Sequence, residues 1–213
     1  MSHAAVLDPT PLLRTAVVPV LTIARVADAV PLARALAAGG LDVIEVTLRT
    51  PVALEAIRSI AEAVPEVVVG AGTITSAADV TAAVQAGARY LVSPGTPAAL
   101  VEPLAASGVP CLPGCATVSE AMALAQRGFR VLKFFPAEAS GGVAWLKSVA
   151  GPLPDLTFCP TGGIDARNVG TYLAQPNVRA VGGSWVAPKE AVTAGDFARI
   201  TALAAAAAVA RAA

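Results

Sequence analysis

The chain has 213 residues, of which 55% are hydrophobic and only 14% are charged. This length suits one large domain or two small ones, and the composition is too apolar for an intrinsically disordered protein. The 15 basic and 15 acidic residues balance to a formal net charge of zero, and no basic stripe is visible. We therefore expect neither nucleic acid nor a membrane surface as a partner.

The cysteines and the histidine limit the possible chemistry. Cys111, Cys115 and Cys159 lack the spacing of a disulfide framework, which is typical of a reducing, cytoplasmic setting. His3 is the only histidine, so Ser-His-Asp triads, Cys-His pairs and histidine-built metal sites are excluded. No apolar stretch is long enough to span a membrane, and residues 1–10 do not resemble a secretory signal. Acid–base chemistry must fall to carboxylates, lysine, tyrosine, cysteine or water.

Short β-branched runs alternate with alanine- and leucine-rich segments along the chain. A short helix is expected first, around Asp8–Thr15. Strands are predicted at Val17–Ile23, Asp42–Arg49, Val67–Thr73, Tyr90–Gly95, Val109–Cys115, Val131–Ala137, Thr157–Gly163 and Arg179–Trp185. Helices are predicted at Arg25–Ala38, Pro51–Ala63, Ser76–Ala86, Pro97–Ala106, Val118–Arg127, Val143–Ala150, Ala166–Leu173 and Ala191–Ala208.

Eight strand–helix units predict one α/β domain, residues 1–213, folded as a (β/α)8 TIM barrel with a short extra N-terminal helix. An open doubly wound sheet is the alternative, but no glycine-rich dinucleotide turn follows the first strand. Ser76 and Asp165 are expected to cap the N-termini of their helices. Gly39, like three later glycines, is expected just after a helix end.

The second strand carries charge into the predicted barrel. By the period of two, Glu45, Thr47 and Arg49 share the inward face, while the intervening Ile44, Val46 and Leu48 face the helices. The carboxyl ends of barrel strands are where active sites lie, so Glu45 and Arg49 are candidates for the site. A simple internal ion pair is the alternative interpretation.

Lys133 stands inside the apolar run Val131–Pro136, which is typical of a buried strand. An unpaired buried ammonium tends to lose its charge, and a neutral lysine is a nucleophile that forms Schiff bases with carbonyl compounds. Pairing with a buried carboxylate, or a stem that reaches the surface, is the alternative.

Two consecutive strands end in glycine pairs, Gly162-Gly163 and Gly182-Gly183. The loops after strands seven and eight of a barrel form a recurrent phosphate site, and glycine lets backbone N–H groups approach phosphate oxygens. Plain turn chemistry is the alternative for either pair. Together with Lys133, Glu45 and Arg49, these loops indicate Schiff-base chemistry on a phosphorylated keto acid.

Six motifs in order along Val17–Trp185 resemble those of the KDPG/KHG aldolase family. They are Glu45-Val-Thr-Leu-Arg49, Gly70-Ala-Gly-Thr73, Ser93-Pro94-Gly95, Lys133-Phe-Phe-Pro136, Thr161-Gly-Gly163 and Gly182-Gly-Ser-Trp185. The resemblance implies a TIM barrel and a homotrimer that needs no metal or other cofactor. It also implies reversible cleavage of 2-dehydro-3-deoxy-6-phosphogluconate to pyruvate and glyceraldehyde 3-phosphate in the Entner–Doudoroff pathway, with 4-hydroxy-2-oxoglutarate as a further substrate.

The resemblance also implies a role for each matching residue. Lys133 would form the Schiff base, and Glu45 would act as general acid and base through a bound water. The substrate would be held by Arg49 and Thr73 at its carboxylate, Pro94 and Phe135 as walls, Thr161 near the carbonyl, and Gly162, Gly163, Gly183 and Ser184 at its phosphate.

Two other functions stay open at this point. One is a sugar-phosphate isomerase or synthase on the same barrel, in which Lys133 would be only an electrostatic group. The other is a non-catalytic barrel that binds a phosphometabolite. The preference between the gluconate and galactonate epimers is also open, although Thr161 favours the gluconate epimer by resemblance.

Overall fold

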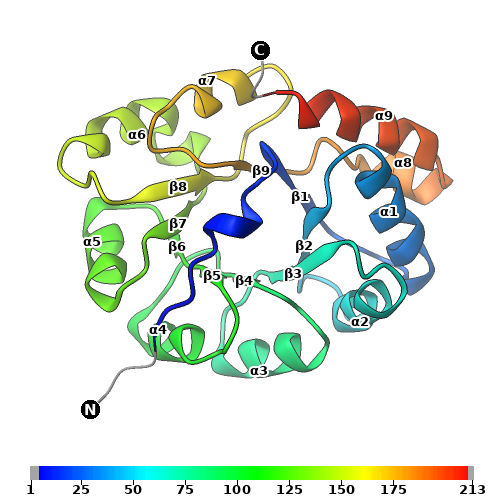
Figure 1. Ribbon diagram of the computed structural model, residues 1–213, viewed down its shortest axis with the longest axis horizontal. Coiled ribbons are helices and arrows are strands. Elements are labelled where there is room, and N and C mark those ends of the chain that lie inside the picture. The colour runs from blue at the N-terminus through cyan, green and yellow to red at the C-terminus, as the bar shows by residue number, and fades with distance from the viewer. Residues whose placement is uncertain (1–4, 211–213) are drawn as a thin grey trace.

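The computed structural model describes residues 5–210 and consists of parallel strands surrounded by helices (Figure 1). His3 and the last three residues lie outside this range. The strands are β1 Val17–Leu21, β2 Val43–Thr47, β3 Val68–Gly72, β4 Leu91–Val92, β5 Cys111–Leu112, β6 Gly114–Cys115, β7 Val131–Phe134, β8 Thr157–Pro160 and β9 Val181–Gly183. The helices are α1 Val26–Ala38, α2 Ala53–Ala63, α3 Ala77–Gln85, α4 Ala98–Ala105, α5 Val118–Arg127, α6 Gly142–Ala150, α7 Val169–Leu173, α8 Lys189–Ala194 and α9 Phe197–Ala208, with 3₁₀ turns η1 Thr10–Leu12 and η2 Glu138–Ser140.

The strands form two parallel sheets, one with the order β5-β4-β3-β2-β1-β9 and one with the order β6-β7-β8. The last strand therefore pairs with the first, with Val17 opposite Val181. Two isolated parallel bridges, Phe158 to Val178 and Thr161 to Gly182, connect β8 and its end to the segment around β9. The predicted parallel α/β arrangement is confirmed.

The fifth predicted strand, Val109–Cys115, is wrong as a single element. Pro113 divides it into β5, which pairs with β4, and β6, which pairs with β7. Proline has no N–H to donate to a ladder, so a strand is interrupted there. The Pro113 carbonyl still accepts a hydrogen bond from the Lys133 N–H at 3.0 Å, which ties the break to the neighbouring strand.

Apolar side chains pack on both faces of the strands. The larger cluster lies between strands and helices and includes Ile44, Val46, Leu132 and Phe134. The smaller cluster contains the inward residues Leu13, Val18, Val43, Val68, Tyr90, Val92, Leu112, Val131, Cys159 and Ala180. The inward and outward faces predicted for β2 and β7 are thus confirmed. Leu13 directly follows η1, the short N-terminal helix that crosses the centre of the ring in Figure 1.

Helix ends follow the sequence signals only in part. Ser76 caps α3 as predicted, in a capping box with Asp79. Asp165 does not cap a helix: α7 begins later, after Asn168, because residues 165–168 form a turn. The single helix predicted at Ala191–Ala208 is two helices, since Gly195 ends α8 in a left-handed conformation (φ 69°) and Asp196 caps α9.

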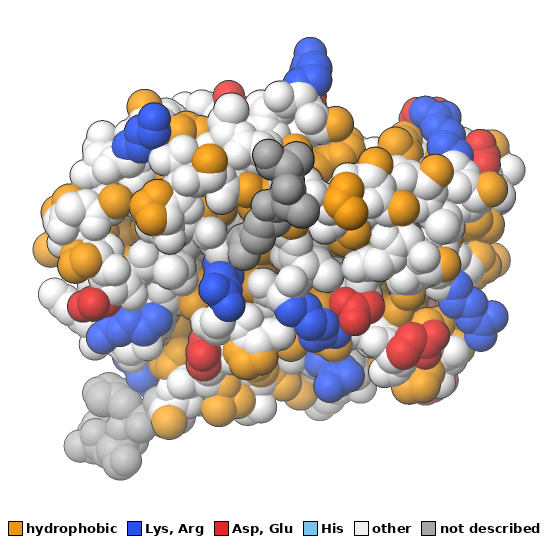
Figure 2. Space-filling view, turned by 45° about the horizontal axis from the view of Figure 1, so that its top comes forward, with side chains coloured by type: hydrophobic (Ala, Val, Ile, Leu, Met, Phe, Trp, Pro, Cys, Tyr) orange, Lys and Arg blue, Asp and Glu red, His pale blue; other side chains and the backbone are white. Residues whose placement is uncertain are grey.

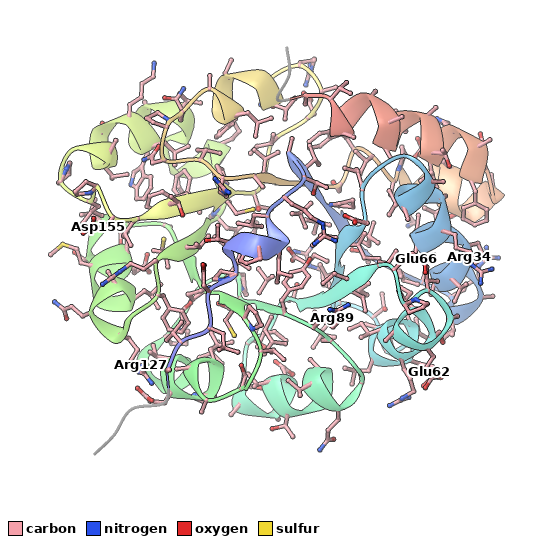
Figure 3. The ribbon with its side chains drawn as sticks, viewed as in Figure 1. Arg34, Glu62, Glu66, Arg89, Arg127 and Asp155 are labelled. Carbon is pink, nitrogen blue, oxygen red and sulfur yellow. The ribbon has the colours of Figure 1, made fainter. Side chains whose placement is uncertain are left out.

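Charged side chains are dispersed on the outside of the fold. Figure 2 shows basic and acidic groups interspersed over the face in view, and Arg34, Glu62 and Glu66 lie around α1 and α2 in Figure 3. In residues 5–210, no helix has both the length and the apolar character that crossing a bilayer requires.

Candidate active site

Lys133 and Glu45 form an ion pair inside the ring of strands. Their residues are 4% and 3% exposed, and Lys133 Nζ lies 3.1 Å from Glu45 Oε1. Lys133 is therefore buried, as expected. It pairs with a buried carboxylate, which is one of the two alternatives that the sequence left open, and its stem does not reach the surface. An amine and a carboxylate in contact away from water can exchange a proton directly.

Gly72, near the end of β3, makes room for this pair. A Cβ added at Gly72 would lie 2.0 Å from Glu45 Oε1, closer than any real contact. Glu45 comes from β2, whose register places Thr47 opposite Gly72, so the carboxylate leans along the sheet towards the ends of the strands. The pair thus depends on a residue without a side chain at position 72.

The interior next to the pair holds two further polar groups, which the sequence alone did not single out as part of the site. Cys159 is opposite Lys133 in the sheet register, and Tyr90 is 2% exposed with its ring on Gly70. Burial raises the pKa of the Cys159 thiol to about 12, and burial followed by the charge of Glu45 raises the pKa of Tyr90 well above its usual value. Both groups therefore stay protonated near neutral pH.

Arg49 and Thr73 meet at the carboxyl ends of β2 and β3. Arg49 Nε donates to Thr73 Oγ1 at 3.2 Å, and Arg49 is exposed. Thr73 has a left-handed φ of 62°, which is unfavourable for a β-branched residue and is found where surrounding structure enforces it. A planar guanidinium in this place can bind a carboxylate through two hydrogen bonds.

Phe135 and Pro94 follow strands of different sheets, β7 and β4. The Phe135 ring centroid is 5.5 Å from Lys133 Nζ. Pro94 follows β4 so closely against β6 that a Cβ at Gly114 would lie 2.4 Å from the Pro94 carbonyl carbon. Phe135 thus contacts the lysine side of the site, while Pro94 lies where β4 and β6 converge.

The two glycine pairs have different local reasons to be glycine. Gly162 and Gly163 have φ values of 102° and 77°, so their turn needs left-handed residues. Gly183 is covered by the Trp185 indole, and Thr161 Oγ1 lies 2.3 Å from where a Cβ on Gly182 would be. The bridge between Thr161 and Gly182 places the two loops side by side.

A cavity of about 690 Å³ adjoins the loop after β9. Its lining includes Ser184 and Trp185, but neither Lys133 nor Glu45. The cavity therefore lies beside the loop after β9, not over the ion pair. In the described part of the chain, no three His, Cys, Asp or Glu side chains are grouped so that they could hold a metal ion.

A family model described as KDPG and KHG aldolase matches residues 10–203. The chain belongs to this aldolase family. The family resemblance predicted from the six motifs is thereby confirmed.

Relatives of the aldolase family are similar over most of the chain. The 2-dehydro-3-deoxy-phosphogluconate aldolase of Pseudoalteromonas atlantica is 52% identical over 188 residues, which cover 88% of this chain and 87% of that protein. The KHG/KDPG aldolase of Escherichia coli is 48% identical, with 88% of each chain covered.

Solved structures of aldolases share the fold. The KDPG aldolase from Legionella pneumophila, with pyruvate captured as a covalent carbinolamine intermediate, superposes with a TM-score of 0.93 at 43% identity, covering 95% of this chain and 98% of that one. The aldolase of Zymomonas mobilis ATCC 29191 has a TM-score of 0.89 at 46% identity, covering 95% and 97%.

Proposed function

We propose that this chain is a Schiff-base (class I) aldolase. It reversibly cleaves 2-dehydro-3-deoxy-6-phosphogluconate to pyruvate and glyceraldehyde 3-phosphate, the cleavage step of the Entner–Doudoroff pathway. The observation that carries the proposal is the buried Lys133 in contact with Glu45, in a chain about half identical to curated aldolases. The Legionella relative, in which pyruvate is captured as a covalent carbinolamine, supports the same chemistry on Lys133.

The reaction begins with proton transfer in the ion pair. Glu45 takes a proton from the Lys133 ammonium, to which it is already hydrogen-bonded at 3.1 Å. The neutral amine attacks the C2 ketone, and Glu45 returns the proton to the departing hydroxyl as the carbinolamine loses water, which gives a protonated imine. The imine draws the electrons of the C3–C4 bond as that bond breaks, while Glu45, through a bound water, accepts the C4 hydroxyl proton. The aldehyde departs, Glu45 returns this proton through water to C3 of the enamine, and hydrolysis of the resulting imine releases pyruvate and the lysine.

The other site residues hold the substrate. Arg49 and Thr73, which are hydrogen-bonded to each other, bind the pyruvyl carboxylate and so bring C2 within reach of the amine. Pro94 and Phe135 wall the pocket, and Thr161 contacts the substrate near C2. Backbone groups at Gly162, Gly163, Gly183 and Ser184 bind the phosphate, and the bridge between Thr161 and Gly182, which brings their two loops together, supports this role.

We further propose that the strands close into one (β/α)8 barrel domain over residues 1–213. The pairing of β1 with β9 and the bridge from Thr161 to Gly182 support closure on one side. On the other side, β5 and β6 count as one strand interrupted at Pro113.

The resemblance to the family also supports a cytoplasmic homotrimer, and the three free, buried cysteines agree with a reducing compartment. Activity on 4-hydroxy-2-oxoglutarate is also proposed. The Escherichia coli relative is named KHG/KDPG aldolase, and a solved structure from TTHB1 is named as a 4-hydroxy-2-oxoglutarate aldolase.

Borohydride trapping with pyruvate, followed by peptide mass mapping, tests the proposal. The chain has three lysines, and the exposed Lys147 and Lys189 serve as internal controls. We expect the reduced pyruvyl adduct on Lys133 alone. An unmodified Lys133 would contradict the aldolase mechanism and favour the isomerase or the non-catalytic binding protein.

A further inference from the structure

The glycine loop after β8 is backed by a hydrogen-bonded pair of side chains, Glu138 and Tyr172. The Tyr172 hydroxyl donates to Glu138 Oε1. Tyr172 comes from α7 and is fully buried, whereas Glu138 starts η2 and is exposed. The carboxylate of an exposed residue is thus anchored at one oxygen to the phenol of a buried one.

Glu138 holds the loop through its backbone and its side chain. Its N–H donates to the Gly162 carbonyl at 3.1 Å. A Cβ added at Gly163 would lie 2.6 Å from Glu138 Cγ, so the Glu138 side chain occupies the space over that glycine. The loop cannot shift towards η2 without displacing Glu138 from Tyr172.

Asn168 holds the loop from the other side. Its Nδ2 donates to the Gly163 carbonyl at 3.0 Å, and its Oδ1 accepts from the Asp165 N–H at 2.9 Å. The carbonyl oxygens of Gly162 and Gly163, which would repel a phosphate, are therefore both engaged by the protein.

The same segment connects the loop to the lysine. Glu138 is five residues beyond Lys133, and between them the Ala137 N–H donates to the Thr161 carbonyl at 2.8 Å. We propose that Glu138 and Tyr172 are positioning residues whose hydrogen bond fixes the Gly162–Gly163 loop at a set distance from Lys133. This inference rests on the proposed aldolase function, in which the loop binds the substrate phosphate.

The positioning role makes a specific demand on the substrate. A phosphorylated substrate is held at both ends, so its carbonyl is placed correctly only if the loop is placed correctly. Pyruvate and unphosphorylated aldehydes lack the phosphate group that the loop would bind. Loss of the Glu138–Tyr172 bond should therefore weaken reaction of phosphorylated compounds and leave imine formation with pyruvate unchanged.

The test uses Tyr172→Phe, Glu138→Ala and the double variant of the full-length protein. In the condensation direction, kcat/KM is measured with pyruvate and either glyceraldehyde 3-phosphate or glyceraldehyde. We divide kcat/KM for glyceraldehyde 3-phosphate by kcat/KM for glyceraldehyde. Each single variant should lower this ratio about tenfold, mainly by raising KM for glyceraldehyde 3-phosphate. The ratio in the double variant should be no lower than in the more impaired single variant, because the two residues act as one unit.

Glu190→Ala is the matched control. Glu190 is also an exposed glutamate after a glycine loop, but its carboxylate pairs with Arg199 at 3.4 Å. Glu190→Ala should leave the ratio of the two kcat/KM values unchanged. It therefore distinguishes the effect of Glu138 on the loop from the effect of a change in net charge. An unchanged ratio in both single variants, or an equal loss with both aldehydes and in borohydride trapping by pyruvate, would overturn the inference. If the wild type itself gives no adduct on Lys133, the proposed function fails instead.

Discussion

The central residues of the site are two opposite charges that the fold removes from water. Lys133 and Glu45 are both almost fully buried and in contact, so each is the counter-ion of the other. A buried ion pair contributes little net stability, since desolvation offsets the attraction, but removal of one partner leaves a costly unpaired charge. Net stability therefore does not account for this pair, whereas the proposed Schiff-base mechanism does.

Lys133→Ala should abolish cleavage, because no other amine lies beside Glu45 in the described interior. Glu45→Gln should slow turnover sharply and still allow some imine formation, since it keeps the nucleophile and removes the base. A lactate dehydrogenase assay for released pyruvate measures turnover, and borohydride trapping measures the imine. Near-normal turnover of the lysine variant would exclude Lys133 as the nucleophile.

Within residues 5–210, the buried Tyr90 hydroxyl has no hydrogen-bond partner. Such a group costs about 1–3 kcal/mol of folding free energy. Tyr90→Phe should therefore leave the free energy of unfolding unchanged or raise it by about 1 kcal/mol. Tyr172→Phe is the comparison, because it removes a hydroxyl that is bonded to Glu138 and should lower stability. Denaturant unfolding of both variants measures the difference, and equal losses would show that the Tyr90 hydroxyl has a partner in solution.

At the scale of elements, the sequence predicted the order of strands and helices better than their ends. Alternation of apolar residues on β2 and β7 correctly separated Glu45 and Lys133 from the helix-facing side chains. The breaks at Pro113 and Gly195 carried visible signals, a residue without an N–H and a helix-ending glycine, but each lay inside a longer apolar pattern. The distant contacts of the site could not be predicted from local pattern, because Gly72 and Gly182 are explained only by the side chains of Glu45 and Thr161, which lie far from them in the sequence.

The packing of α1 on α9 gives another glycine a role that the sequence does not show. Gly39 has an ordinary φ of −86°, so it is not needed for a left-handed turn. A Cβ there would lie 2.5 Å from the Ala204 Cβ and 2.6 Å from the Thr201 carbonyl oxygen. Helices that approach this closely leave no space for a methyl group.

Gly39→Ala should accordingly destabilise the protein by about 1–3 kcal/mol through overpacking between α1 and α9. Gly170→Ala in α7 is the control, because a Cβ there meets nothing within 4 Å and alanine favours a helix by up to about 1 kcal/mol. Thermal unfolding of the two variants should shift in opposite directions. A neutral Gly39→Ala would mean that α9 can move away from α1 at no cost.

The whole molecule keeps its three cysteines as buried thiols. Burial raises the pKa of Cys111 to about 11 and, with the charge of Glu120 adding to burial, that of Cys115 to about 12. For Cys159 burial also dominates and the pKa is about 12. The unfolded chain ionises these thiols from about pH 8.5–9, well before the folded protein does. The contribution of the three protonated thiols to the free energy of unfolding is complete below about pH 8.5. It is lost as the pH rises towards the pKa values of the folded protein.

Alkaline pH should therefore unfold the protein in a way that depends on the number of buried thiols. Each thiol lowers the free energy of unfolding by roughly 1.4 kcal/mol per pH unit once the unfolded chain is ionised and the folded protein is not. Between about pH 9 and 10.5 the slope should be shallower by about 1.4 kcal/mol per pH unit in Cys111→Ala and, separately, by about the same amount in Cys115→Ala, while Cys159 stays in place beside Lys133. Urea unfolding across this range measures the slopes. The same slope in wild type and variants would mean that the thiols ionise equally in both states, in which case their burial does not contribute to the pH dependence.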